Sequence, residues 1–172
     1  VFGLLFYFLF PVQQKMSWIL VFLTLSVGCL AAPFLVQWAY AIFPETVNDH
    51  SLLKQAFIGH RLEMWNFVAV EILKQPFTGY GLEFTRNYDG FVAPTKYLLG
   101  TSLLHPHSMI LQLWVEFGLI GVVFVLVLIG LFFRWLKTHL ALEQQKIALT
   151  MSMSVFLVSC FSYGLWQGWW LG

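Results

Sequence analysis

The sequence predicts an all-α fold: a polytopic membrane helix bundle with a partly helical external loop. Of the 172 residues, 59% are hydrophobic and 10% are charged, whereas a soluble domain has roughly 25% charged residues. Three apolar segments are long enough for membrane-spanning helices, which need about 20 residues each. Tryptophans gather near the ends of these segments, as in an aromatic belt at a membrane surface: Trp114, Trp135, Trp166, Trp169 and Trp170.

Residues 1–43 are expected to hold the end of one span and one full span. The opening ten residues are apolar but too few to cross a bilayer, so we expect them to be the tail of a span that begins upstream. The chain is accordingly expected to be a fragment of a larger protein. The full span begins near Ser17 and is interrupted by Gly28 and Pro33. Membrane helices tolerate such residues when neighbouring groups satisfy the freed backbone carbonyls.

Residues 44–112 form the expected external loop, which contains a helix over about 60–75. Pro76 should end that helix, and the sequence T-G-Y-G at 78–81 predicts a tight turn. The helical repeat places four residues on one face of the helix: Arg61, Trp65, Val68 and Ile72.

The rest of the chain is expected to contain two spans, 113–135 and 147–172, joined by a cytoplasmic loop over 136–146. The first of them should continue a helix that begins near Pro106, because proline is favoured in a first turn. The positive-inside rule places the short connections in the cytoplasm and the long loop outside. The charges behind this orientation are Lys15, Arg134, Lys137 and Lys146 against Glu143.

The segment 104–121 reads L-H-P-H-S-M-I-L-Q-L-W-V-E-F-G-L-I-G and keeps polar side chains at the mouth of an apolar helix. A polar group left unpaired in hydrocarbon costs several kcal/mol, so this pattern indicates a site at the membrane surface. Ser108, Gln112 and Glu116 recur at helical spacing and predict a single polar stripe.

His107 lies beside this stripe. A histidine at such a boundary can be neutral near pH 7 and can accept a proton from a hydroxyl. The alternative is that His105 and His107 cap the helix or bond to loop carbonyls; Gln112 and Glu116 on adjoining faces favour the site. Metal binding by H-P-H is a rival interpretation, but a zinc site needs about three or four ligands and the aspartates are distant in sequence. We therefore expect no metal and no cofactor.

Arg61 at the start of the external helix is a second candidate, because a guanidinium can bind phosphate oxygens through two parallel hydrogen bonds. Its alternative roles are a solvated charge or a partner for Glu63 or Glu116. Gly118 and Gly121 continue the His107 face and would let another helix or a lipid chain come close.

His107-Ser108, followed after nine residues by Gly118-x-x-Gly121, resembles the H-[N/S/Q]-x9-G-x-x-[G/T/Y] signature of the bacterial O-antigen ligase family. That family groups O-antigen ligases, some polysaccharide polymerases and O-oligosaccharyltransferases. The segment from Arg61 to Leu82 is similar to the family's R-x3-W…P-x-x-G-x-G block. The chain would correspond to the C-terminal portion of a member.

The resemblance implies an inverting, metal-independent glycosyltransferase at the periplasmic face of the bacterial inner membrane. Its donor would be a glycan on undecaprenyl diphosphate, its acceptor a hydroxyl of lipid A–core, and its surroundings membrane lipid, with no nucleic acid as partner. By position, His107 would be the catalytic base, and Arg61 would neutralise the diphosphate leaving group. The supporting residues would be Ser108, Gln112, Glu116, His105, Gly118 and Gly121.

Two departures from the family pattern and several alternatives remain. The first is that Ser108 stands where the family most often has asparagine. The second is that the other spans and a second family arginine would lie upstream of this chain. The fragment alone is therefore expected to be inactive. A polymerase or a protein O-oligosaccharyltransferase of the same superfamily is the alternative activity. A transporter segment with Glu116 in a proton relay, or a membrane subunit without catalysis, are alternatives of other classes.

Overall fold

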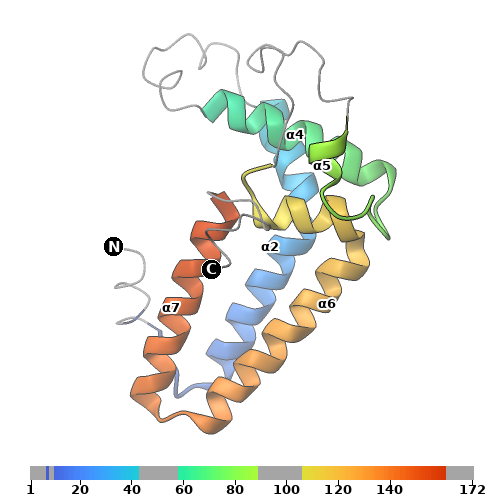
Figure 1. Ribbon diagram of the computed structural model, residues 1–172. Coiled ribbons are helices and arrows are strands. Elements are labelled where there is room, and N and C mark those ends of the chain that lie inside the picture. Colours follow the sequence, from blue (N-terminus) through green and yellow to red (C-terminus); the bar gives the residue numbers. More distant parts are fainter. Residues whose placement is uncertain (1–6, 8–9, 43–57, 89–105, 162–172) are drawn as a thin grey trace.

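The computed structural model describes residue 7 and residues 10–42, 58–88 and 106–161. Within these residues all regular structure is helical, which confirms the all-α prediction. Both α2 and α7 pack along α6, and α4 lies across one end of α2 (Figure 1). The helices are α2 (Lys15–Ile42), α4 (Ile58–Lys74), α5 (Phe84–Asn87), α6 (Met109–His139) and α7 (Leu142–Phe161).

Two of the described helices are long and apolar enough to cross a membrane. They are α2, with 28 residues and a mean hydropathy of 2.5, and α6, with 31 residues and a mean hydropathy of 2.7. Their outward sides expose large apolar side chains, which calls for a cover of lipid or protein. Examples are Leu20, Val27, Phe34, Ile120, Phe124 and Leu131. The predicted last span, 147–172, extends past α7 into residues outside the described part and stays a prediction.

Pro33 interrupts the hydrogen bonding of α2. Proline has no N–H, so the carbonyl of Cys29, four residues earlier, loses its helical donor. The indole Nε1 of Trp114 donates to that carbonyl at 2.8 Å. The expectation that a neighbouring group satisfies the freed carbonyl is confirmed. Our assignment of Trp114 to the aromatic belt is wrong, because the side chain is only 5% exposed and bonds inside the protein.

The core lies in two clusters, one at each end of the bundle. The first joins α2, α4 and α6: Cys29, Met64, Val68, Ile72, Leu111, Trp114, Val115, Val122 and Leu126. The second joins the start of α2 to the end of α6 and to α7: Val12, Trp18, Phe133, Leu136, Leu149 and Met153. Val68 and Ile72, which the helical repeat placed on one face of the external helix, are fully buried, whereas Arg61 of the same face is exposed. In water, burying each such side chain is worth about 1.5–3 kcal/mol.

Helix α6 is broken at Gly118, whose φ of 62° and ψ of −160° are not helical. The short part before the break, drawn in yellow, lies across the end of the bundle, and the long part descends beside α2 (Figure 1). The predicted start near Pro106 is wrong by three residues. His107 has a left-handed φ of 49° and Ser108 is extended, with φ −151° and ψ 114°, so the helix begins only at Met109.

Candidate functional site

The turn after α4 fits into the break of α6. A break leaves the last carbonyls of one helical segment and the first N–H groups of the next without partners. Backbone N–H and C=O groups of the turn act as the missing partners, through hydrogen bonds of 2.7–3.2 Å. They are Tyr80 N to Val115 O, Gly81 N to Glu116 O, Leu119 N to Pro76 O, and Ile120 N to Phe77 O.

Glycine is required on both sides of this junction. Gly79 and Gly118 have φ values of +66° and +62°, a region that side chains disfavour. A Cβ on Gly79 would lie 2.5 Å from the carbonyl carbon of Glu116, and a Cβ on Gly118 would overlap the backbone of Phe77. The close approach at Gly118 is thus made by the turn, and not by the second helix or lipid chain that we expected.

The turn is also held by Tyr80. Its ring stacks on Phe84 with centroids 4.2 Å apart, and its hydroxyl donates to the Glu71 carbonyl at 3.3 Å. Burial, together with the charge of Glu71, raises the pKa of the Tyr80 hydroxyl, which therefore stays a proton donor. The Glu71 carboxylate accepts a 2.7 Å hydrogen bond from Lys74, and this bond raises the lysine pKa. The bond from Tyr80 fixes the end of α4 against the turn, and the pair of Glu71 and Lys74 lies within the last turn of the helix itself.

The predicted polar stripe is one buried side of the short part of α6. Ser108, Gln112 and Glu116 are 6%, 3% and 1% exposed. The Gln112 side-chain amide donates to Glu116 Oε1 at 2.9 Å, and the backbone N–H of Glu83 donates to the same oxygen at 3.1 Å. The carboxylate of Glu116 therefore joins the start of α5 to α6. These two hydrogen bonds give Glu116 a structural role at the junction of α5 and α6.

His107 is half-buried and adopts the left-handed conformation at φ 49°. This region costs an L-residue about 1–2 kcal/mol, so the surrounding structure has to hold it there. The indole Nε1 of Trp65 donates a 2.7 Å hydrogen bond to the carbonyl of Pro106, the preceding residue. Helix α4 thereby fixes the loop that carries His107.

Arg61 lies one turn before Trp65 on α4 and is exposed. Its Nη1 donates to the carbonyl of Phe161 at 2.9 Å, rather than to Glu63 or Glu116 as the alternatives proposed. The Trp65 ring lies 6.0 Å from the Phe161 ring. The start of α4, the loop of His107 and the end of α7 therefore meet at one end of the bundle.

A mostly apolar groove opens between the start of α6 and α7, beside this meeting point. Its volume is about 460 Å³, and one wall is Met109, two residues after His107. The other lining residues belong to α7: Met151, Ser152, Val155, Phe156 and Ser159.

Two contacts of the site were not predicted. The bond from Trp65 to Pro106 had a signal, because Trp65 is the tryptophan of the R-x3-W block. The hydrogen bond from Glu83 N–H to Glu116 had no signal in the sequence. His105 lies outside the described residues. Among the residues the structure describes, no group of three or more His, Cys, Asp or Glu side chains could hold a metal ion.

Comparison with known proteins decides the family. A family model described as O-antigen ligase matches residues 1–126, which include both motif blocks. The chain belongs to the O-antigen ligase family. The two blocks that mark the family in this sequence are thus the two segments that interlock at Gly79 and Gly118.

Similar proteins come from Rickettsia species and are named as candidate polysaccharide ligases. The protein of Rickettsia conorii is 30% identical over 159 residues, covering 88% of this chain and 37% of its own length. The protein of Rickettsia prowazekii is 28% identical over 157 residues, which cover 88% of this chain and 38% of the relative. The protein of Rickettsia bellii is 28% identical over 168 residues, which cover 95% of this chain and 40% of the relative. The chain thus spans about two fifths of these relatives. No solved structure matches it significantly.

Proposed function

We propose that the full-length protein is an inverting glycosyltransferase that moves a glycan from undecaprenyl diphosphate to a hydroxyl of lipid A–core. The family and the names of the relatives support a ligase that transfers glycans. The apolar helices α2 and α6 support a membrane location, where a lipid-linked donor would be met. The active site would lie on the periplasmic face of the inner membrane, and the cationic short connections support this orientation.

The observation that carries the proposal is the hydrogen bond from Trp65 to the carbonyl of Pro106. It connects the helix of Arg61 directly to the loop of His107. A cation and a base on separate elements are thereby held at one end of the bundle, as transfer from a diphosphate requires.

In the proposed reaction His107 Nδ1 or Nε2 takes the proton of the acceptor hydroxyl. The acceptor oxygen forms a bond to the anomeric carbon from the face opposite the diphosphate, which inverts that carbon. The bond from the anomeric carbon to the diphosphate oxygen breaks, and undecaprenyl diphosphate leaves with the electron pair. Arg61 stabilises the charge that grows on this leaving group, using N–H donors beyond the one bonded to Phe161.

The groove beside Met109 suits the lipid part of the donor. Its lining is mainly methionine, valine and phenylalanine, and it begins two residues from His107. An isoprenoid chain in this groove would leave its diphosphate near the start of α6.

The experiment uses the full-length protein in proteoliposomes with a lipid-linked glycan and lipid A–core. The variant His107→Gly keeps the left-handed backbone and removes only the imidazole, so transfer should fall by roughly 100- to 10,000-fold. Arg61→Lys should also lose most activity because bidentate geometry is lost. Arg86→Lys is the matched control, since Arg86 is exposed and paired with Glu83 at 3.1 Å.

Transfer by His107→Gly at the wild-type rate would contradict the base assignment. A second lipid-linked glycan, offered as acceptor, separates the ligase from the alternative polymerase. If only that glycan is elongated, the protein is a polymerase and the proposed acceptor is wrong.

A further inference from the structure

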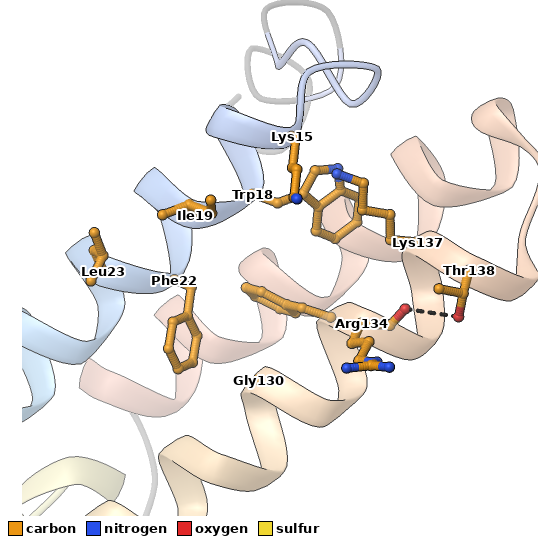
Figure 2. A pocket seen from close by; sticks show the side chains of 10 residues that line it. Lys15, Trp18, Ile19, Phe22, Leu23, Gly130, Arg134, Lys137 and Thr138 are labelled. Atoms are coloured by element: carbon orange, nitrogen blue, oxygen red, sulfur yellow. Dashed lines mark hydrogen bonds between the residues drawn. The ribbon is translucent and has the colours of Figure 1, made fainter.

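A second groove lies between the start of α2 and the end of α6 (Figure 2). These two helix ends lie at the opposite end of the bundle from the start of α6 (Figure 1). Its volume is about 350 Å³. The residues that line it come from these two helices: Lys15, Trp18, Ile19, Phe22, Leu23, Gly130, Phe133, Arg134, Lys137 and Thr138.

The floor of this groove is aromatic. Trp18 and Phe133 pack edge to face with centroids 5.8 Å apart, and Phe22 lies 6.4 Å from Phe133. A Cβ on Gly130 would lie 3.3 Å from the Phe22 ring, so the glycine lets the helices approach while the groove stays open. Ile19 is 43% exposed at the rim. The floor thus offers an acyl chain a continuous apolar surface.

Among the described residues that line the groove, the polar rim carries three cations and no carboxylate. Lys15 extends from α2, and Arg134 and Lys137 from α6, around the space between the helices (Figure 2). Among the described residues, none of these three side chains forms an ion pair. The nearby acid of the α6–α7 connection, Glu143, instead bonds Lys146 at 3.3 Å and Tyr7 at 3.0 Å.

We propose that this groove is a binding site for an anionic phospholipid. One acyl chain lies on the aromatic floor, and the phosphate is bound by Arg134 and the two lysines. Basic pockets between membrane helices have this chemistry. Charge complementarity decides against an apolar helix as the occupant, because such a helix would leave three cations crowded without a counter-charge. The lipid would belong to the leaflet opposite the His107 site.

The test titrates the purified full-length protein with dioleoylphosphatidylglycerol and, separately, with dioleoylphosphatidylcholine, and counts bound lipids by native mass spectrometry. We expect one phosphatidylglycerol to bind in preference to phosphatidylcholine. The triple variant Lys15→Gln, Arg134→Gln, Lys137→Gln should weaken phosphatidylglycerol binding roughly hundredfold, since each cation near a membrane surface contributes about fivefold. Arg134→Gln alone should weaken phosphatidylglycerol binding about fivefold, and this single variant replaces the triple variant in the test if the triple variant does not fold.

Lys146→Gln is the matched control, because Lys146 lies beside the same end of α6 but does not line the groove. It should bind phosphatidylglycerol as the wild type does. Ile19→Trp fills the apolar rim without altering charge and should also weaken binding. The proposal is overturned if the wild type binds both lipids equally, as it would if another helix covered the groove. Unchanged binding by the triple and single charge variants would overturn it as well.

Discussion

Gly79 and Gly118 each lie against the backbone segment that carries the other, and neither position has room for a side chain. A Cβ on Gly79 would lie 2.5 Å from the Glu116 carbonyl carbon, and one on Gly118 would overlap Phe77. Both residues also have positive φ values, which glycine adopts without strain. The junction between the two family motifs therefore depends on two missing side chains.

We expect Gly118→Ala to destabilise the full-length protein by about 3 kcal/mol, from a strained φ and an overpacked junction. Unfolding in detergent, followed by circular dichroism, measures this loss. Gly28→Ala is the control, because a Cβ at that position meets nothing within 4 Å. Equal stability of the two variants would contradict the packing argument.

Trp114→Phe should destabilise the protein by about 1 kcal/mol, because the carbonyl of Cys29 loses the indole N–H that donates to it. Pro33→Ala restores a backbone N–H that can donate to this carbonyl. In a double-mutant cycle of unfolding free energies, Trp114→Phe should then cost clearly less in the Pro33→Ala background. An identical cost in both backgrounds would show that the freed carbonyl is unimportant.

Trp65→Phe keeps an aromatic ring near Phe161 but removes the hydrogen bond to Pro106. We expect glycan transfer to fall by roughly 10- to 100-fold, because the base would be poorly positioned. Unfolding free energy should change by only about 1 kcal/mol. Trp135→Phe, at a 50% exposed tryptophan near the other end of α6, should transfer glycan normally. Normal transfer by Trp65→Phe as well would remove the positioning role.

Glu116→Gln tests whether the buried carboxylate moves protons. A glutamine oxygen can still accept the bonds from Glu83 N–H and Gln112, so transfer activity should persist with about 1 kcal/mol less stability. Glu116→Ala removes the acceptor of both hydrogen bonds and should be far less stable. If Glu116→Gln is folded but as inactive as His107→Gly, the carboxylate takes part in the chemistry or in a proton relay.

Local patterns predicted most of the fold. The apolar runs predicted α2 and α6. The helical repeat placed Val68 and Ile72 on one face of α4, and both side chains are buried in the structure. The break at Gly118 could not be predicted in this way. A glycine in an apolar helix fits close helix packing as well as a positive φ, and only the distant turn at 76–81 decides between them.

One geometric feature of the candidate site, the polar stripe, was predicted as well. Helical periodicity placed Ser108, Gln112 and Glu116 on one side, which the structure confirms. It could not predict that Glu116 bonds to Glu83, because a contact across 33 positions leaves no periodic trace. The left-handed backbone of His107 was likewise not predicted, because this conformation is uncommon in residues other than glycine and depends on the surroundings.

The break at Gly118 also sets the match between helix and bilayer. A continuous helix of 31 residues would be about 46 Å long, well beyond the roughly 30 Å of a hydrocarbon core. Turning the first segment aside leaves residues 119–139, about 31 Å at 1.5 Å per residue, and the stretch before Arg134 that carries no charged side chain is about 22 Å of this length. This uncharged stretch has no excess length over the hydrocarbon core and needs no strong tilt to fit it. In a bilayer, a shift of α6 along the normal would create a hydrophobic mismatch, so the length of α6 after the break would also resist movement of the His107 loop that precedes it.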